Sequence, residues 1–452
     1  MNILDLDDWD VVQRNLVDGE YVVTASPLKP PGACPACGAA NLYGHGRRIE
    51  KVRDLPSYGK RTIIRAVRNR FKCRECGHTF AERLPDVDSK HRATVRLVEW
   101  VARQALARPF ANVAEEVGLN EITVRRIFAE HVEVLNKDWE RKVETPAWLG
   151  IDEVKLAGDI RCIMADVLAR SAIDLLPKRD KATVAARISK MPNRDQIQVV
   201  VIDMWRQYRQ VANEVLPQAD VVVDRFHVER LATRGLETIR RSLHDDLTPA
   251  MRKQLKHDRF ILLSRPSRLT DRHRFILETW AANYPALSTA YDLKEGFYRV
   301  YDQGDEDTAG EMLDEWVASI PKEMRYAFKP LTTALGNWRP EILGFFKHRV
   351  TNAYTEGLNG LVKMANRQGR GHSFETIRAK LLFHIAPQPE PLTAQAEAGW
   401  QVIAAGATWV YARDLMPLSE VIENALDAHL GSGISTTEEG PDESDEIIGF
   451  HQ

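Results

Sequence analysis

The order of strand and helix segments after Pro146 constrains the fold of this 452-residue chain more than any other feature. Three β-rich segments joined by short turns come first, and helices then alternate with two further strands. In chain order we predict strands at 147–155, 160–168 and 171–176, a helix at 181–191, a strand at 197–202, a helix at 206–216 and a strand at 220–223. This order predicts an α/β core built on one sheet.

Acidic residues stand at particular places in this order. Asp152 lies among apolar neighbours in the first strand, and Glu356 lies far downstream on a predicted helix within 351–363. The order of the segments is the ribonuclease-H-like one, in which the first acid lies on the first strand and the second at the end of the fourth. By this count the second acid is Asp203. The competing candidate is Asp224, at the end of the fifth strand.

These acids are suited to hold divalent cations. Mg²⁺ and Mn²⁺ prefer oxygen ligands, and two such ions about 4 Å apart can activate the attacking oxygen and stabilise the leaving one at a phosphodiester. Each acid alone could be a solvated strand end. Because one fold would bring all three together, we predict a two-ion site formed by Asp152, Asp203 and Glu356. Asp224 and His227 form a D-x-x-H pattern that fits either the rim of this site or a helix N-cap with a satisfied histidine.

Four of the five cysteines form two C-x-x-C-G motifs, Cys34–Cys37 and Cys73–Cys76. Each pair has metal-ligand spacing, and two pairs supply the four thiolates of a tetrahedral zinc site. A disulfide pair is disfavoured in a cytoplasmic protein, and the doubled motif disfavours free buried thiols. We therefore predict structural zinc that staples a basic β-hairpin.

Residues 91–135 predict three helices with a helix-turn-helix. Gly118 supplies the turn, Asn120 can cap the next helix, and Val124 and Ile127 face inward. Three side chains remain at exposed or flanking positions, and we expect them to contact DNA: Thr123, Arg125 and Arg126. A plain helical hairpin with solvated arginines is the alternative.

Charge is distributed unevenly along a chain whose formal net charge is −2. Between positions 47 and 74 the sequence has eleven Lys or Arg, including Arg47 and Arg48, and only two acids. This excess of positive charge favours a polyanionic partner. The chain ends in an acidic tail that we expect to be disordered. No apolar run approaches the roughly 18 residues of a membrane span, and the first residues lack an export signal. We expect a cytoplasmic protein with no membrane partner.

The stretch from Arg225 to about Arg349 predicts helices only, without a nucleotide-binding loop. We interpret it as a helical insertion. Its tryptophans, Trp280, Trp316 and Trp338, are predicted to be core residues, and a base-stacking surface is the alternative. After Glu356, a basic glycine-containing loop suits phosphate contact, although an ordinary solvated turn would look the same. The expected contacts are Lys363, Arg367 and Arg370.

Several of these motifs together resemble a family. The paired cysteine motifs, the helix-turn-helix, GIDE at 150–153, the run from Asp203 through LPQADVVVDRFHV and the segment TNAYTEGLNGLVK resemble bacterial insertion-sequence transposases of the ISL-three family, over roughly residues 30–385. The resemblance implies a DDE transposase that binds terminal inverted repeats and target DNA and acts by cut-and-paste. It also implies assembly as a homodimer or larger on double-stranded DNA, associated with the nucleoid. Related transposases with D-x-x-H after the fifth strand take their second acid from the fourth.

The predicted fold is therefore a multidomain α+β protein with an N-terminal four-cysteine zinc ribbon, a helix-turn-helix and a ribonuclease-H-like α/β catalytic core interrupted by an all-α insertion. We predict the following division: 1–33 leader, 34–80 zinc-binding domain, 88–136 helix-turn-helix domain, 145–224 first part of the core, 225–349 insertion, 350–388 last part of the core and 389–452 C-terminal extension. Two alternatives to an active transposase stay open: a transposase-derived DNA-binding regulator without catalysis, and a metal-dependent nuclease or resolvase.

Overall fold

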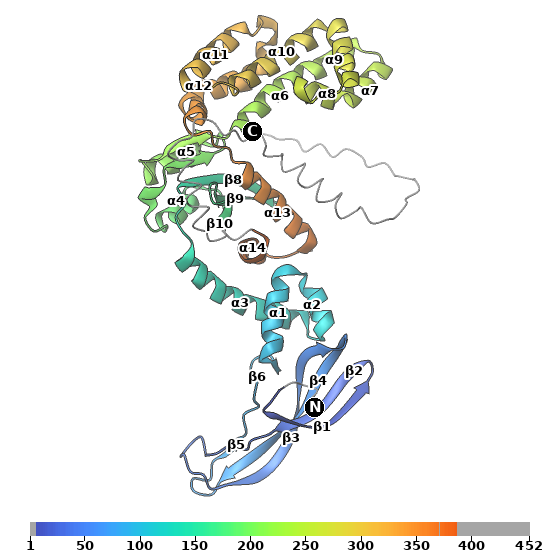
Figure 1. Cartoon of the computed structure of the whole chain (residues 1–452), viewed down its shortest axis with the longest axis vertical. Helices are drawn as coiled ribbons and strands as arrows, with labels where there is room; N and C mark the ends of the chain where they lie inside the picture. Colours follow the sequence, from blue (N-terminus) through green and yellow to red (C-terminus); the bar gives the residue numbers. More distant parts are fainter. Residues whose placement is uncertain (1–5, 370, 387–452) are drawn as a thin grey trace, which may run out of the picture. The chain divides into compact units, whose positions relative to one another are not determined.

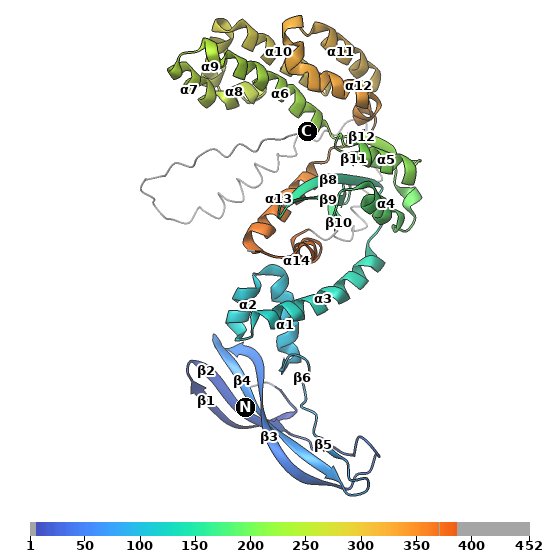
Figure 2. The ribbon, with the colours of Figure 1, turned by 180° about the vertical axis from the view of Figure 1, so that it is seen from behind.

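The computed structural model describes residues 6–386 apart from Arg370 and the side chains of Lys142, Asp245 and Asp246 (Figures 1 and 2). The predicted C-terminal extension with its acidic tail, residues 389–452, lies outside the described residues. No described helix is long and apolar enough to cross a membrane.

The first sheet contains seven strands in the order β1-β2-β4-β3-β7-β6, with β5 paired to β4. They are β1 (Trp9–Val17), β2 (Glu20–Pro27), β3 (Leu42–Ser57), β4 (Lys60–Cys73), β5 (Thr79–Ala81), β6 (Val87–Asp88) and β7 (Ala93–Thr94). The antiparallel pair β3–β4 forms the long hairpin that the basic segment predicted.

We predicted a leader at residues 1–33, and this prediction is wrong for residues 9–27. These residues form the β-hairpin of β1 and β2. Its second strand, β2, pairs parallel with β4. The physical reason is a small shared core, in which Trp9 and Val23 pack with Ile64 and Ala66 of β4. The prolines at the end of β2 indicated a turn and masked the alternating strand before them.

Three helices follow: α1 (Val95–Ala107), α2 (Phe110–Val117) and α3 (Glu121–Lys142). Helix α1 begins at Val95, later than expected, because the Thr94 hydroxyl caps its first turn. Gly118 adopts a left-handed conformation with φ of 70° and ends α2, and the Asn120 side chain caps α3. Val124 and Ile127 are buried, so the inward face of the predicted helix-turn-helix is confirmed.

The second sheet has five strands in the order β10-β9-β8-β11-β12. They are β8 (Trp148–Leu156), β9 (Asp159–Asp166), β10 (Ser171–Leu176), β11 (Val199–Ile202) and β12 (Asp220–Val223), with α4 (Lys181–Ser189) and α5 (Arg206–Val215) between them. Strand β9 is antiparallel to β8 and β10, whereas β11 is parallel to both β8 and β12. Every predicted segment of this region is present.

Between β12 and residue 348, the described elements are helices. They are α6 (Arg225–Ser242), α7 (Pro249–His257), α8 (Arg259–Leu263), α9 (Asp271–Asn283), α10 (Pro285–Val300), α11 (Glu306–Ser319) and α12 (Arg325–His348), with short 3₁₀ turns at Leu243–Asp246, Pro266–Arg268 and Lys322–Met324. Trp280, Trp316 and Trp338 are at most 8% exposed, which confirms that they are core residues. One apolar cluster joins this helical region to β11 and β12.

The chain then returns to the second sheet through α13 (Ala353–Gly369), α14 (Phe374–Lys380) and a π-helical turn at Leu381–Ile385. Leu358 and Val362 of α13 pack with Val154 and Leu156 of β8. The α13 helix can approach β8 closely because position 150 is glycine. A Cβ atom there would lie 2.5 Å from the Asn352 side chain.

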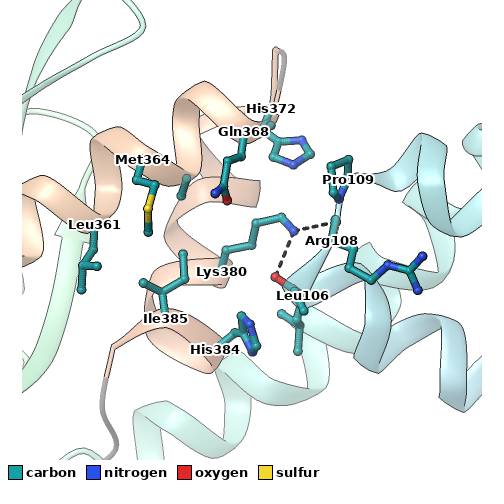
Figure 3. A pocket seen from close by; sticks show the side chains of 13 residues that line it. Leu106, Arg108, Pro109, Leu361, Met364, Gln368, His372, Lys380, His384 and Ile385 are labelled. Carbon is teal, nitrogen blue, oxygen red and sulfur yellow. Dashed lines mark hydrogen bonds between the residues drawn. The ribbon is translucent and has the colours of Figure 1, made fainter. Parts of the chain in front are cut away.

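Lys380, at the end of α14, links the second-sheet region to the helix-turn-helix (Figure 3). Its buried Nζ donates hydrogen bonds to the carbonyl oxygens of Ala105, Leu106 and Arg108, at 2.7 to 3.0 Å. These carbonyls lie at the C-terminal end of α1, where a cation satisfies unpaired acceptors and the negative end of the helix dipole. A cavity of about 350 Å³ lies beside this contact, and His372 and His384 are among its lining residues.

Candidate active site

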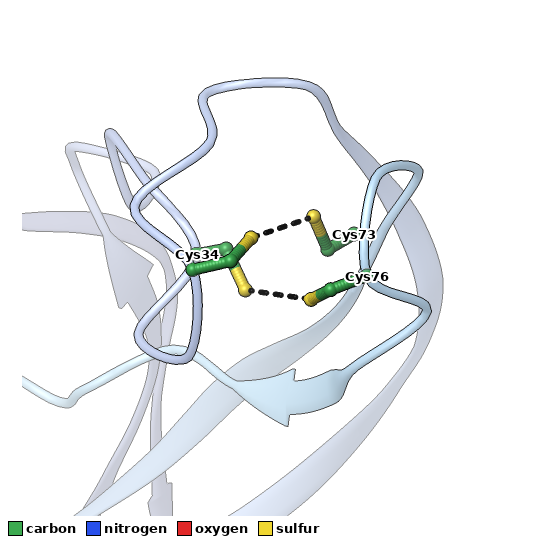
Figure 4. A group of neighbouring side chains, drawn as sticks. Cys34, Cys73 and Cys76 are labelled. Atoms are coloured by element: carbon green, nitrogen blue, oxygen red, sulfur yellow. Dashed lines mark hydrogen bonds between the residues drawn. The ribbon is translucent and has the colours of Figure 1, made fainter.

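Two clusters of metal-ligating side chains exist among the described residues, one of thiols and one of acids with a histidine. The four Sγ atoms of the thiol cluster lie within 4.8 Å of one another (Figure 4). The Sγ atoms of Cys34 and Cys76 are 3.6 Å apart, as are those of Cys37 and Cys73. No disulfide joins them. This geometry fits the predicted structural zinc site, because four thiolates at such spacing complete a tetrahedral shell.

The acidic site begins with three aspartates in one row across the second sheet. Strand β11 lies between β8 and β12 and is parallel to both. Continuing the pairing two residues past Val201 and Gly150 puts Asp203 beside Asp152, and the same row continues to Asp224 on the other side. Side chains at matched positions of parallel neighbours emerge on the same side of a sheet. The two candidate second acids thus follow directly after neighbouring parallel strands, which explains why segment order alone separates them poorly.

Asp152 is 4% exposed and faces α13. One of its carboxylate oxygens accepts a hydrogen bond of 2.7 Å from the Asn359 side-chain amide, and the other accepts one from the backbone N–H of Glu153. Asn359 lies three residues after Glu356, on the same side of the helix. The contact between α13 and β8 therefore also brings Glu356 near Asp152.

His227 lies at the centre of the acidic cluster. Its Nε2 atom is 4.0 Å from a carboxylate oxygen of Asp152, 4.0 Å from one of Asp224 and 3.9 Å from one of Glu356. Ligand atoms of Asp224, His227 and Glu356 all lie within 4.8 Å of one another. Residues from β8, the start of α6 and the returning helix α13 thus meet at one point.

Asp203 lies to one side of this cluster. A carboxylate oxygen accepts a hydrogen bond of 3.0 Å from the backbone N–H of Trp205. The nearby charges are those of Glu153, Asp152 and Arg179, and Arg179 forms an ion pair with Glu153. The geometry thus brings Asp152, Asp224, His227 and Glu356 together and leaves Asp203 adjacent, on the side where Arg179 lies.

Burial dominates the electrostatics of the site. It raises the pKa of Asp152 to about 6. Burial, and then the charges of Glu153 and Asp152, raise the pKa of Asp203 to about 7. Burial likewise raises the pKa of Asp224 to about 7, with a further upward effect of Glu356. Among the described residues, no Lys or Arg forms an ion pair with any of these three carboxylates, so their burial is not offset by a paired charge.

Several buried atoms at the site have no hydrogen-bond partner among the described residues, including Oδ2 of Asp224, Nε2 of His227 and Oδ1 of Asn359. Orphaned buried acceptors of this kind are rare unless something outside the protein satisfies them. The unpaired oxygen and the crowded, hard carboxylate donors fit a divalent cation such as Mg²⁺ or Mn²⁺.

The residues predicted to contact DNA differ in how exposed they are and in whether they already contact another side chain. Arg47 and Arg48 are exposed on β3, and Arg48 forms an ion pair with Glu50. Arg125 forms an ion pair with Glu121 at 2.5 Å, and an Arg126 nitrogen lies 3.2 Å from Nδ1 of His91. Of the other predicted contacts, Thr123 is half-buried on α3, and Lys363 and Arg367 are exposed on α13. Arg370 lies outside the described residues.

Sequence reasoning missed one structural residue of the site and undervalued another. Asn352, fully buried just before α13, donates its backbone N–H to Asp224 and its side-chain amide to the Ile151 carbonyl. The only signal was its place before the predicted helix, where asparagine commonly occurs. Asn359 lies three positions after Glu356, a spacing that puts both on one side of a helix, but its bond to Asp152 required knowledge of the fold.

Comparisons with known proteins agree with this geometry. A family model described as "Transposase", of the ISL3 group, matches residues 149–381. The model "zinc-finger of transposase IS204/IS1001/IS1096/IS1165" matches residues 30–76, and "Helix-turn-helix domain of transposase family ISL3" matches residues 82–132.

Among curated relatives, the transposase for insertion sequence element IS1001 of Bordetella parapertussis is 28% identical over 367 residues, which cover 76% of this chain and 87% of the relative. The transposase for insertion sequence element IS1557 of Mycobacterium tuberculosis is 24% identical over 397 residues, which cover 80% of this chain and 88% of the relative.

Proposed function

Since the chain belongs to the ISL3 family of transposases, we propose that it moves its insertion sequence by cut-and-paste, through a DDE triad that acts with Mg²⁺ or Mn²⁺. The single observation that carries this proposal is the convergence of Asp152 of β8, Asp224 after β12 and Glu356 of α13 around His227, with Asp203 adjacent. The strand order β10-β9-β8-β11-β12 supports a ribonuclease-H-like core, and the helices between β12 and α13 would be its all-α insertion.

In this proposal Asp152, Asp203 and Glu356 hold two cations. The strand order supports Asp203, because it follows directly after β11, the parallel neighbour of the β8 strand that carries Asp152. The cluster around His227 supports Asp224 as the alternative second acid. When bound, the ions would lower the pKa of the attacking hydroxyl and neutralise charge that develops on the phosphate. Asn359 would orient the Asp152 carboxylate through its 2.7 Å hydrogen bond.

The proposed reaction has two displacements at phosphorus. Water first attacks the phosphodiester at the transposon end, its oxygen bonds to phosphorus, and the bond from phosphorus to the 3′-oxygen breaks. This step leaves a 3′-hydroxyl on the transposon and a 5′-phosphate on the flanking DNA. The 3′-hydroxyl then attacks a target phosphodiester and displaces a target 3′-oxygen, so no oxidant or reductant is needed.

DNA recognition is proposed for the N-terminal modules. The start of α3, with Thr123, Arg125 and Arg126, would enter a major groove of the terminal inverted repeat. Arg47 and Arg48 of the zinc hairpin and Lys363 and Arg367 of α13 would contact phosphates. Two copies of the protein would hold the two ends of the element, in the bacterial cytoplasm at the nucleoid.

Cleavage and joining of a labelled repeat-end duplex test the proposal. Asp152→Ala should abolish cleavage and strand transfer in Mg²⁺ while the affinity for the repeat stays within about twofold, because the acid lies in the second sheet, outside the DNA-recognition modules. Asp159→Ala, at the exposed start of β9, is the control and should cleave normally. Cleavage without joined products would indicate a nuclease, and binding without any cleavage by the unaltered protein would indicate a regulator.

A further inference from the structure

The helical region has a basic segment and an acidic segment toward opposite ends. Residues 249–275, which span α7, α8 and the first half of α9, contain eight Lys or Arg and two acids. Residues 305–319, with α11, contain six acids and no Lys or Arg. Figures 1 and 2 show α7, α8 and α9 together at one end of the helical region and α11 toward the other. A polyanion would therefore be attracted to the first end and repelled from the second.

Four cations at the basic end are free to bind a partner. Lys253, Arg268, Arg272 and Arg274 are exposed, and none has a carboxylate partner among the described residues. Two other arginines of the same segment do form ion pairs, Arg259 with Glu237 and Arg265 with Asp302. The exposed cations therefore carry charge that no acid of the described chain neutralises.

Two aromatic side chains lie on the same helices. Phe260 of α8 and Phe275 of α9 are each 70% exposed, whereas Trp280, on the same helix as Phe275, is 8% exposed. Residues 270–275 are all exposed, so the first turn of α9 is open to solvent and to a partner. A single exposed phenylalanine is common on protein surfaces. Two of them, on helices α8 and α9, lie in the same segment as four exposed cations that have no carboxylate partner among the described residues, and this combination of stacking platforms and charge matches surfaces that bind single-stranded nucleic acid.

We infer that Lys253, Phe260, Arg268, Arg272, Arg274 and Phe275, here called the basic aromatic surface, bind an unpaired DNA strand. The cations would contact phosphates, and the phenylalanine rings would stack on bases. This inference deepens the proposed function, because the strand would be DNA near the cleaved transposon end. A nucleic acid offers phosphates and flat apolar faces at alternating positions, which is what this surface requires.

A second copy of the chain is a weaker candidate for this surface. Its acidic helix α11 could pair with the cations, but Val317 is the only large hydrophobic residue that α11 exposes among the described residues, at 37%. One such side chain offers little apolar area for two phenylalanine rings. Charge alone would hold that interface, and exposed ion pairs contribute little.

The test is binding of a fluorescein-labelled oligothymidylate of about 12 nucleotides by the full-length zinc-loaded protein without Mg²⁺, followed by fluorescence anisotropy. We expect Phe275→Ala and Phe260→Ala each to weaken binding by about tenfold, because stacking on one base contributes on that order. Phe275→Trp should retain binding. Arg272→Ala should weaken binding and reduce the slope of log affinity against log salt by about 0.7.

The control is Tyr326→Ala, which removes an aromatic side chain of comparable exposure, 56%, from the start of α12. It should leave the affinity unchanged. Ultraviolet crosslinking to an iodouracil oligonucleotide should label peptides from residues 249–275 in the unaltered protein. Because no cleavage is measured, the result is independent of whether the proposed catalytic acids are correct.

Two outcomes would overturn the inference. Equal affinity of the phenylalanine variants and the unaltered protein, with crosslinks confined to the N-terminal modules, would exclude DNA at this surface. Unchanged DNA affinity with loss of self-association in Phe275→Ala, measured by analytical ultracentrifugation, would assign the surface to a second copy of the chain.

Discussion

The zinc module and the acidic site are both built from metal-ligating side chains, but the chain assembles them in different ways. The thiols come from two local C-x-x-C-G motifs in one sheet, and turns that end at Gly38 and Gly77 fold each pair. The acids come from separate strands and from a helix that returns after the whole helical region. Local spacing therefore defines the first site, and sheet register defines the second.

The energetic roles of metal in the two sites should differ as well. A structural zinc site contributes directly to folding free energy, because its ligands meet only when the module is folded. The acidic site sits on a sheet with its own apolar core, in which Leu149, Ile151 and Val201 are fully buried. We expect loss of zinc to unfold a module and loss of the acids to stop the reaction in a folded protein.

Removal of one thiol should have the largest effect. Cys73→Ser should lose the zinc and unfold the first sheet, and the affinity for the terminal repeat should fall about a hundredfold or more, because phosphate contacts of the hairpin are lost together. Zinc content by atomic absorption and repeat binding check this. Cys162→Ser, at a buried cysteine of β9 away from the zinc cluster, is the control and should retain both zinc and repeat binding.

The two candidate second acids give the next comparison. If Asp203 is the second acid, Asp203→Asn should reduce cleavage by ~10³-fold, comparable to the loss of other groups that stabilise charge in a transition state. Asp224→Asn should then retain most cleavage, since the amide can still accept the backbone N–H of Asn352. The opposite ranking would assign the role to Asp224. Circular dichroism should show both variants folded.

Gly150→Ala tests whether the acidic site depends on close packing of α13. The added Cβ atom would lie 2.5 Å from the Asn352 side chain and 2.7 Å from that of Thr355, so α13 must shift. We expect a loss of about 1–3 kcal/mol in unfolding free energy and a marked fall in cleavage, with normal zinc content. Gly336→Ala in α12, where no atom lies within 4 Å, should be neutral or slightly stabilising. Normal cleavage by Gly150→Ala would show that the site tolerates movement of α13.

The smallest expected effect is that of Asp203→Asn on how the melting temperature changes with pH. Burial raises the pKa of Asp203 to about 7 from an ordinary 3.8, so the metal-free folded protein holds a proton there that the unfolded chain has released. The stability that this proton contributes is fully present below about pH 4 and is lost as pH rises through about 7. The melting temperature of Asp203→Asn should therefore rise relative to that of the unaltered protein between about pH 5 and 8. A constant difference across that range would contradict the raised pKa.

Sequence patterns predicted the local features of this protein more fully than its long-range contacts. The strands 171–176 and 220–223 have the bounds that periodicity predicted, and the cysteine spacing identified the thiol cluster. The hairpin at 9–27 was missed, because proline-rich turns signal loops more strongly than short alternating strands signal pairing. The D-x-x-H pattern offered the rim of the acidic site as one of two places for His227, but its position among three carboxylates depends on how α6 and α13 meet β8. Contacts between segments more than a hundred residues apart leave no local spacing to detect.

We propose that Asp152 of β8, the acids that follow its neighbouring strands and Glu356 of α13 hold divalent cations at one place. The most direct measurement is a Mn²⁺ titration of the zinc-loaded protein followed by electron paramagnetic resonance, with Asp152→Ala and Glu356→Gln beside the unaltered chain. The account predicts two coupled Mn²⁺ ions in the unaltered protein and loss of the coupled signal in both variants. Identical Mn²⁺ binding by all three proteins would contradict it.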